Sequence, residues 1–163
     1  MYTLGHLGIS LTVYAPIAAW YLRAGATELA IAGGAVMLAL ATVPDMDEYT
    51  ELISHRGPTH TIWFALAAGM AVGLFTGATI VAASLPFDAI AVSTHLGILG
   101  TLAIVSHLLG DIITPMGIWP FRPLSERHYS LDLVYAKNPS ANRLFFGFGL
   151  SSTGVAVAAT ALI

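Results

Sequence analysis

Residues 97–113 read GILGTLAIVSHLLGDII, an apolar run that closes on a histidine and an aspartate. The run lies in a longer apolar segment, from about Ile90 to Ile113, that is long enough for a helix to cross a bilayer. Its small residues allow close approach to a neighbouring helix. His107 and Asp111 are four residues apart, so both side chains lie on one helix face, about one turn apart. This stretch therefore predicts a membrane helix with a polar site at its end.

The composition points to the same class of protein. The chain has 163 residues, of which 56% are hydrophobic and 9% are charged, and its mean hydropathy is +0.79. Soluble domains usually carry about 25% charged residues. The net charge of −3 and the lack of a basic tract argue against nucleic-acid binding, and the lack of cysteine excludes disulfides and thiolate metal sites. We expect one integral membrane domain over residues 1–163, with residues 1–22 a retained first span rather than a signal peptide.

The expected fold is an all-α polytopic helical bundle with about five transmembrane helices. Strands are not expected, because long apolar runs in lipid must satisfy their backbone hydrogen bonds internally, as helices do. The second segment stops at a proline, which disfavours helix at the residue before it. The five predicted spans are Leu7–Leu22, Leu29–Val43, about Thr61–Ala83, about Ile90–Ile113, and about Leu144 to the C-terminus.

With five spans, the N-terminus and the loops 44–60 and 114–143 lie on one side of the membrane. The first side carries five of the six Lys and Arg residues, and the other side carries only Arg23. The positive-inside rule therefore makes the first side cytoplasmic. Histidines and aspartates from four separate segments also fall on this side, and ionisable residues in a membrane protein are functional candidates by default. The cations on the first side are Arg56, Arg122, Arg127, Lys137 and Arg143.

We interpret this convergence as a divalent-metal site, because histidine and carboxylate are the usual ligands of a catalytic zinc or a similar ion. An open position would be left for water or substrate. One or two ions are expected, with zinc favoured. The predicted ligands are His6, Asp45, His60, His107 and Asp111, with His55 as a further candidate.

The loop PDMDEYTELISHRGPTH, Pro44–His60, carries the roles that stay open. Asp47 could position a ligand histidine or act as a general base. Alternatively, both aspartates of the loop could simply be polar residues that end a helix and face solvent. Arg56 could clamp an anionic oxygen, since its planar fork matches phosphate or carboxylate. It could equally bind lipid headgroups or Asp45. His55 and His60 could also be interfacial histidines without a metal.

Three other polar residues are not expected to be metal ligands. His95 lies twelve residues before His107, so about 18 Å away along a helix, and Asp88 lies beyond it; both are excluded from the site. His128 is on the expected side in a long loop, as a candidate substrate contact. The 114–143 loop mixes aromatic, proline and basic residues and could cover the interface as an amphipathic segment, or simply connect two spans.

The order of these motifs resembles the YdjM-like family of membrane-bound, metal-dependent hydrolases. The resemblance rests on "GH" near the N-terminus, "VPDMDE", "SHRGPTH" and "SHLLGDIITPMGIWPF", and it covers nearly the whole chain. The only departure is Val43 where leucine is commoner. The motif residues it singles out are His55, Arg56, Gly57, Thr59, His60, His107, Asp111, Thr114 and Gly117. A remoter similarity to zinc-dependent phospholipase C implies phosphoester hydrolysis.

The sequence thus predicts a membrane-embedded hydrolase that acts on a phosphoester or lipid-type substrate at the cytoplasmic interface. Its expected partners are membrane lipids and a small-molecule or lipid substrate; the oligomeric state stays open. Two alternatives remain. A metal-ion or proton transporter would place its site near the bilayer midplane between repeats. A non-catalytic protein that a metal stabilises would keep no ligand position open.

Overall fold

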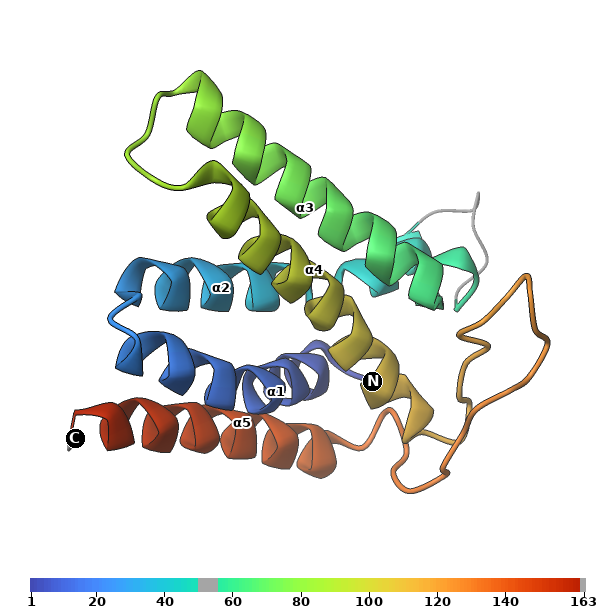
Figure 1. Cartoon of the computed structure of the whole chain (residues 1–163). Coiled ribbons are helices and arrows are strands. Elements are labelled where there is room, and N and C mark those ends of the chain that lie inside the picture. The colour runs from blue at the N-terminus through green and yellow to red at the C-terminus, as the bar shows by residue number, and fades with distance from the viewer. Residues whose placement is uncertain (50–55, 162–163) are drawn as a thin grey trace.

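The chain folds into a bundle of α-helices (Figure 1). The computed structural model describes residues 1–49 and 56–161, and within these ranges the only strand-like pairing is an isolated bridge between Ile118 and Tyr129. The expected all-α class is therefore confirmed for the described residues. Their elements are α1 (Thr3–Arg23), α2 (Thr27–Leu40), the 3-10 helices η1 (Val43–Tyr49) and η2 (Pro58–His60), α3 (Ile62–Ala82), α4 (Ala89–Ile112) and α5 (Pro139–Thr160).

Three helical segments are long and apolar enough to cross a membrane: Thr27–Glu48, which joins α2 to η1, Ile62–Ala82 and Ala89–Ile112. The structure therefore confirms membrane-capable helices but not five spans. The second helix also ends earlier than expected, at Leu40, because the chain from Val43 onwards turns into η1. The last helix begins earlier, at Pro139, because the Asn138 side chain accepts hydrogen bonds from two free N–H groups of its first turn.

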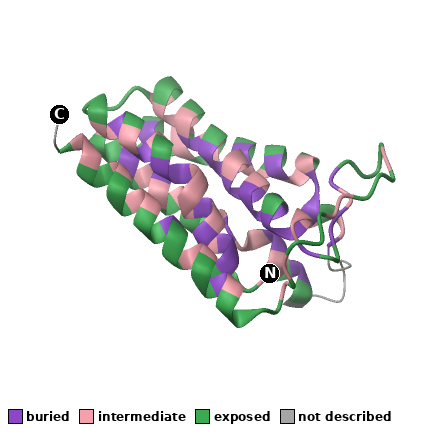
Figure 2. Ribbon diagram, turned by 90° about the horizontal axis from the view of Figure 1, so that it is seen from below, coloured by how far each residue is buried: buried purple, intermediate pink, exposed green. Residues whose placement is uncertain are grey.

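Two helix pairs dominate the packing (Figure 1). α1 packs along α5, and α3 forms a hairpin with α4 that crosses the α1, α2 and α5 group at an angle. The shared core joins α1, α2 and α4 through Tyr14, Met37 and Leu99. Buried positions follow the facing sides of the helices, whereas the outer sides are exposed (Figure 2). Those outer sides carry large apolar residues such as Leu74, Phe75 and Ile90, as expected of helices that face lipid.

Glycines set how closely these pairs approach. A Cβ on Gly8 of α1 would lie 2.3 Å from the carbonyl of Phe145 in α5. A Cβ on Gly69 of α3 would lie 2.0 Å from the Thr101 hydroxyl and 2.5 Å from the Gly97 carbonyl in α4. No larger residue fits at either crossing without moving backbone, so both pairs are held at a distance that only glycine permits.

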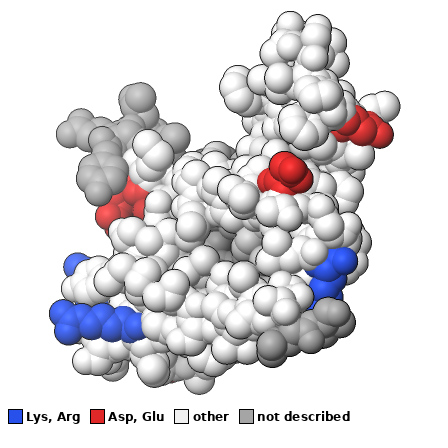
Figure 3. All heavy atoms as spheres, turned by 90° about the vertical axis from the view of Figure 1, so that its left-hand side faces the viewer, with Lys and Arg blue, Asp and Glu red and all other residues white. Residues whose placement is uncertain are grey.

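One end of the bundle gathers the N-terminus, η1, η2 and the last turns of α4 (Figure 1). The α1–α2 turn and the C-terminal end of α5 lie at the other end. Figure 3 faces that other end and shows isolated charged side chains on a largely uncharged surface. The expected convergence of polar segments at one end is therefore what the fold produces.

Gly69→Ala should lower the thermal unfolding midpoint in detergent, whereas Gly77→Ala should not. Both are on α3, but a Cβ on Gly77 meets its nearest neighbour, the Ser93 Cβ, at an ordinary 3.4 Å. Overpacking costs about 1–3 kcal/mol, which outweighs the gain in helix propensity of about 1 kcal/mol from replacing glycine. Equal midpoints for the two variants would show that the α3–α4 crossing is not glycine-limited.

Candidate metal centre

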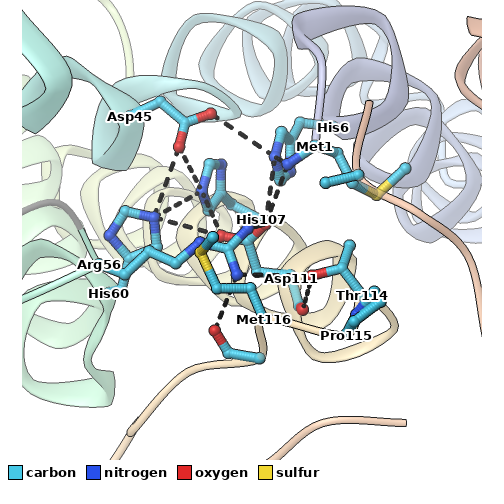
Figure 4. A network of polar contacts seen from close by, with 12 residues as sticks. Met1, His6, Asp45, Arg56, His60, His107, Asp111, Thr114, Pro115 and Met116 are labelled. Atoms are coloured by element: carbon cyan, nitrogen blue, oxygen red, sulfur yellow. Dashed lines mark hydrogen bonds and ion pairs between the residues drawn. The ribbon is translucent and has the colours of Figure 1, made fainter. Parts of the chain in front are cut away.

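Four chain segments contribute side chains to one buried cluster (Figure 4). His6 comes from α1, Asp45 from η1, and His107 with Asp111 from the last turns of α4. Each offers a ligand atom, and these atoms all lie within 4.8 Å of one another. His60, from η2, lies against the same group. The side chain of Asp45 is 23% exposed, whereas the other four are fully buried, so water reaches the cluster on the Asp45 side.

The separations of four of these ligand atoms match a tetrahedral ion site. The Nε2 atoms of His60 and His107 are 3.2 Å apart. Asp45 Oδ1 lies 3.5 Å from the first and 3.4 Å from the second, and Asp111 Oδ2 lies 3.3 Å and 3.5 Å from them. Zinc bonds of 2.0–2.1 Å in a tetrahedron put neighbouring ligand atoms about 3.3 Å apart. The residues therefore fit a zinc-sized divalent ion.

Unsatisfied polar atoms support this fit. Among the described residues, Asp111 Oδ2, His6 Nδ1 and Arg56 Nε are buried and have no hydrogen-bond partner, and of these Asp111 Oδ2 lies among the ligand atoms. Buried polar atoms in folded proteins nearly always have one, so each exception needs a physical explanation. Asp111 Oδ2 faces the Nε2 atoms of His60 and His107, where an ion would satisfy it.

The second oxygens of the two carboxylates face His6. Asp45 Oδ2 lies 3.6 Å from His6 Nε2, and Asp111 Oδ1 lies 3.8 Å from it. The amino group of Met1 contacts the same place, 2.9 Å from His6 Nε2 and 3.0 Å from Asp111 Oδ1. Each carboxylate thus presents one oxygen to the His60 and His107 pair and the other to His6, an arrangement with donors for one or two ions.

Groups behind the histidines orient their Nε2 atoms toward the cluster. His107 Nδ1 lies 2.8 Å from the carbonyl of Ala41 at the end of α2, so it is the protonated nitrogen that donates. His60 Nδ1 lies 3.3 Å from Asp47 Oδ2 and 3.0 Å from the hydroxyl of Thr59. Burial disfavours the charged form of His60, but the carboxylates of Asp111 and Asp45 outweigh it and raise the pKa of His60 above its usual value.

Arg56 is buried, and its guanidinium contacts a member of the cluster. Its Nη2 donates to Asp111 Oδ1 at 2.7 Å, and its Nη1 donates to the Gly117 carbonyl at 2.8 Å. Its backbone has φ of 59°, a left-handed conformation that costs about 1–3 kcal/mol for residues other than glycine. The bond from its backbone N–H to Asp47 Oδ2, at 3.1 Å, helps to hold that conformation. Arg56 thus compensates Asp111 rather than Asp45.

Of the other residues singled out in the sequence, His128, His95 and Asp88 are not part of this cluster. His55 lies outside the described residues. His128 is exposed, with Nε2 2.9 Å from the Met116 carbonyl. His95 packs against Trp20 and Tyr21, and the Asp88 carboxylate caps the first turn of α4.

Sequence reasoning missed two groups that position the site. Thr114 is buried, donates to the Asp111 carbonyl and accepts from Arg56. Residue type and spacing did not indicate Thr114, which was named only as part of the motif that resembles the family. The carbonyl of Ala41, which orients His107, carries no residue-type signal, because any backbone carbonyl would serve.

Asp47→Asn should weaken the binding of Zn²⁺ to the purified protein by about 10–100-fold, the usual cost of losing a group that orients a ligand. The matched control is Asp88→Asn, whose side chain caps a helix equally well and should leave the affinity unchanged. Competition with a chromophoric chelator in detergent measures both. An unchanged affinity in Asp47→Asn would show that Asp47 does not help to orient a metal ligand.

Comparison with known proteins assigns the family. The model of the YdjM inner membrane protein family matches residues 1–163, the whole of this sequence. No curated protein and no solved structure matches the chain. The match agrees with the membrane-capable helices and with the resemblance seen in the motifs. The chain therefore belongs to the YdjM inner membrane protein family.

Proposed function

We propose that this protein is a membrane-embedded, metal-dependent hydrolase that acts on a phosphoester or lipid-type substrate at the cytoplasmic face, with one or two divalent ions, of which zinc is the favoured one. The observation that carries the proposal is the set of five ligand-atom separations, 3.2–3.5 Å, among His60, His107, Asp45 and Asp111. These four residues would hold the first ion. A second ion at His6 and the second carboxylate oxygens would have to displace the Met1 amino group, which contacts His6 Nε2 and Asp111 Oδ1.

The ion would polarise a substrate oxygen and lower the pKa of a bound water molecule. The protein's own groups would hold the ligands still: Asp47 would orient His60, and Arg56 would hold Asp111 in place through its hydrogen bond. In the reaction, the water oxygen bonds to phosphorus, the ester P–O bond breaks, and the leaving alcohol takes up a proton. Water and substrate would arrive on the side of Asp45, which is the partly exposed member of the cluster.

Placing this site on the cytoplasmic side is part of the proposal and rests on charge distribution. The end of the bundle that holds the cluster also carries the segment between α4 and α5, with its cations Arg122, Arg127 and Lys137. Arg23 lies at the end of α1, next to the α1–α2 turn. Short loops rich in Lys and Arg stay in the cytoplasm.

A transporter is less well supported, because transport sites lie near the bilayer midplane between repeats. The cluster sits at one end of the bundle, and within residues 1–49 and 56–161 the only group of ligand-type side chains close enough together to hold a metal ion is His6, Asp45, His107 and Asp111. A non-catalytic metal-stabilised protein stays an outcome of the test below.

His107→Ala and Asp111→Asn should each remove bound metal and lower hydrolysis by more than about 100-fold, since a ligand contributes more than the groups behind it. His95→Ala is the matched control: it lies on the same helix but packs against Trp20. Metal is measured by elemental analysis of the purified protein. Hydrolysis is measured on phosphoester, amide and lipid substrates with and without chelator.

The outcomes separate the alternatives. Metal-dependent hydrolysis that only the His107 and Asp111 variants lose supports the proposal. Bound metal without hydrolysis of any substrate, with a lower unfolding midpoint after chelation, would instead make the metal structural. Metal flux into proteoliposomes without hydrolysis would make the protein a transporter.

A further inference from the structure

The segment between α4 and α5 holds large apolar side chains outside the core. Residues 113–138 leave the end of α4 and form an extended excursion beside the start of α3 (Figure 1). Leu124 is 77% exposed, Leu133 is 70% exposed and Tyr135 is 75% exposed. Leu131 and Phe121 are exposed as well. Several large apolar side chains exposed on one short segment indicate contact with another apolar phase or partner.

The segment is firmly attached to the helices. The backbone N–H groups of Leu131 and Leu133 donate to the carbonyls of Ile112 and Ile113 at 2.7 and 2.9 Å. Ile118 and Tyr129 exchange both of their backbone hydrogen bonds, at 3.0 and 2.9 Å. The exposed apolar side chains therefore project from a hydrogen-bonded frame.

Cations are interleaved with these apolar residues. Arg122 lies 4.6 Å above the Trp119 ring, and Arg127 lies 5.2 Å from the Tyr129 ring. Between residues 119 and 137 there are three Lys or Arg against one Asp and one Glu, in a chain whose net charge is −3, and Arg122 pairs with Glu126. Such a mixture of aromatic, aliphatic and basic side chains is typical of segments that lie in the headgroup layer and attract anionic lipids.

A hollow joins this segment to the turn that carries His60. It has a volume of about 500 Å³ and is lined by Gly57, Pro58, Thr61, Trp63, Arg122 and Pro123. The backbone N–H of Ile62 donates to the Pro120 carbonyl at 2.9 Å, which binds the two walls together. The Arg122 guanidinium is paired with Glu126, at 2.7 Å from its Nε, so the contacts with a headgroup would fall to Arg127 and Lys137.

We propose that residues 119–137 form a membrane-surface element that binds anionic lipid headgroups, with Leu124, Leu131 and Leu133 inserted among the lipids. The charge excess and the exposed apolar side chains together select an anionic lipid surface as the partner. The proposal does not depend on hydrolysis, because lipid contact is measured directly.

The absence of cysteine allows a clean test with one spin label per variant. Leu124→Cys and Leu133→Cys are labelled in full-length protein reconstituted into vesicles of phosphatidylcholine and phosphatidylglycerol. Leu74→Cys, on the outer side of α3, is the lipid-facing reference. Labels in the membrane should collide with oxygen as the reference does. Preference for a water-soluble nickel complex, or shielding from both reagents, would overturn the proposal, since the segment would then lie in water or against protein.

Charge reversal tests the choice of lipid. Arg127→Glu and Lys137→Glu should each reduce the enrichment of phosphatidylglycerol around the protein by more than about five-fold, because each change removes one cation, worth about five-fold at an anionic surface, and adds an anion. Arg23→Glu, the same change at the other end of the bundle, should leave it unaltered. Equal enrichment in all three variants and the unchanged protein would refute binding of anionic headgroups by this element.

Discussion

The carboxylate of Asp111 is fully buried at the end of an apolar helix, and its charge must be compensated there. Two distant segments, the N-terminus and residues 56–60, meet this requirement at the end of α4. Arg56 donates to Oδ1 from the loop before α3, the Met1 amino group contacts the same oxygen, and the imidazole of His60 approaches Oδ2. A buried charge left without such partners would cost several kcal/mol. The arrangement of the polar end of the bundle follows from this one side chain.

The apolar part of the fold makes that arrangement reachable. Glycines at Gly8 and Gly69 let α1 approach α5 and α3 approach α4 more closely than larger residues would allow. Gly110, one residue before Asp111, serves the site in the same way: a Cβ there would lie 3.0 Å from His6 Nδ1. The close contact of α1 with α4 brings the rings of His6 and His107 into a stack 3.7 Å apart. Helix packing and ligand placement therefore both depend on glycines where two helices meet.

The polar cluster and the proposed membrane-surface element share one end of the molecule. Gly117 links them, because its carbonyl accepts from Arg56 while its backbone, with φ of 54°, turns the chain toward Tyr129. A Cβ on Gly117 would lie 2.3 Å from the Tyr129 carbonyl, so only glycine can make this turn. A site next to the headgroup layer can meet both water and lipid, which suits a substrate that belongs partly to each phase.

The sequence by itself determined the all-helical class, the boundaries of α3 and α4 to within a residue or two, and the end of the bundle where histidines and aspartates meet. These features depend on local hydropathy and on helical spacing, such as the four residues between His107 and Asp111, which any single sequence displays. It did not determine how many helices cross the membrane, and α5 began five residues before the predicted start because a capping side chain, rather than hydropathy, sets its beginning.

Only the tertiary structure decided the division of labour inside the polar loop. Asp45 and Asp47 are two residues apart, yet the first reaches the ligand cluster and the second lies behind His60. The 3-10 turn of η1 separates them, and loop geometry of that kind depends on the partners that the loop meets. Arg56 pairs with Asp111, 55 residues away in the chain, and His107 is oriented by a backbone carbonyl of α2. Such contacts join distant segments through space, so no spacing along the chain encodes them.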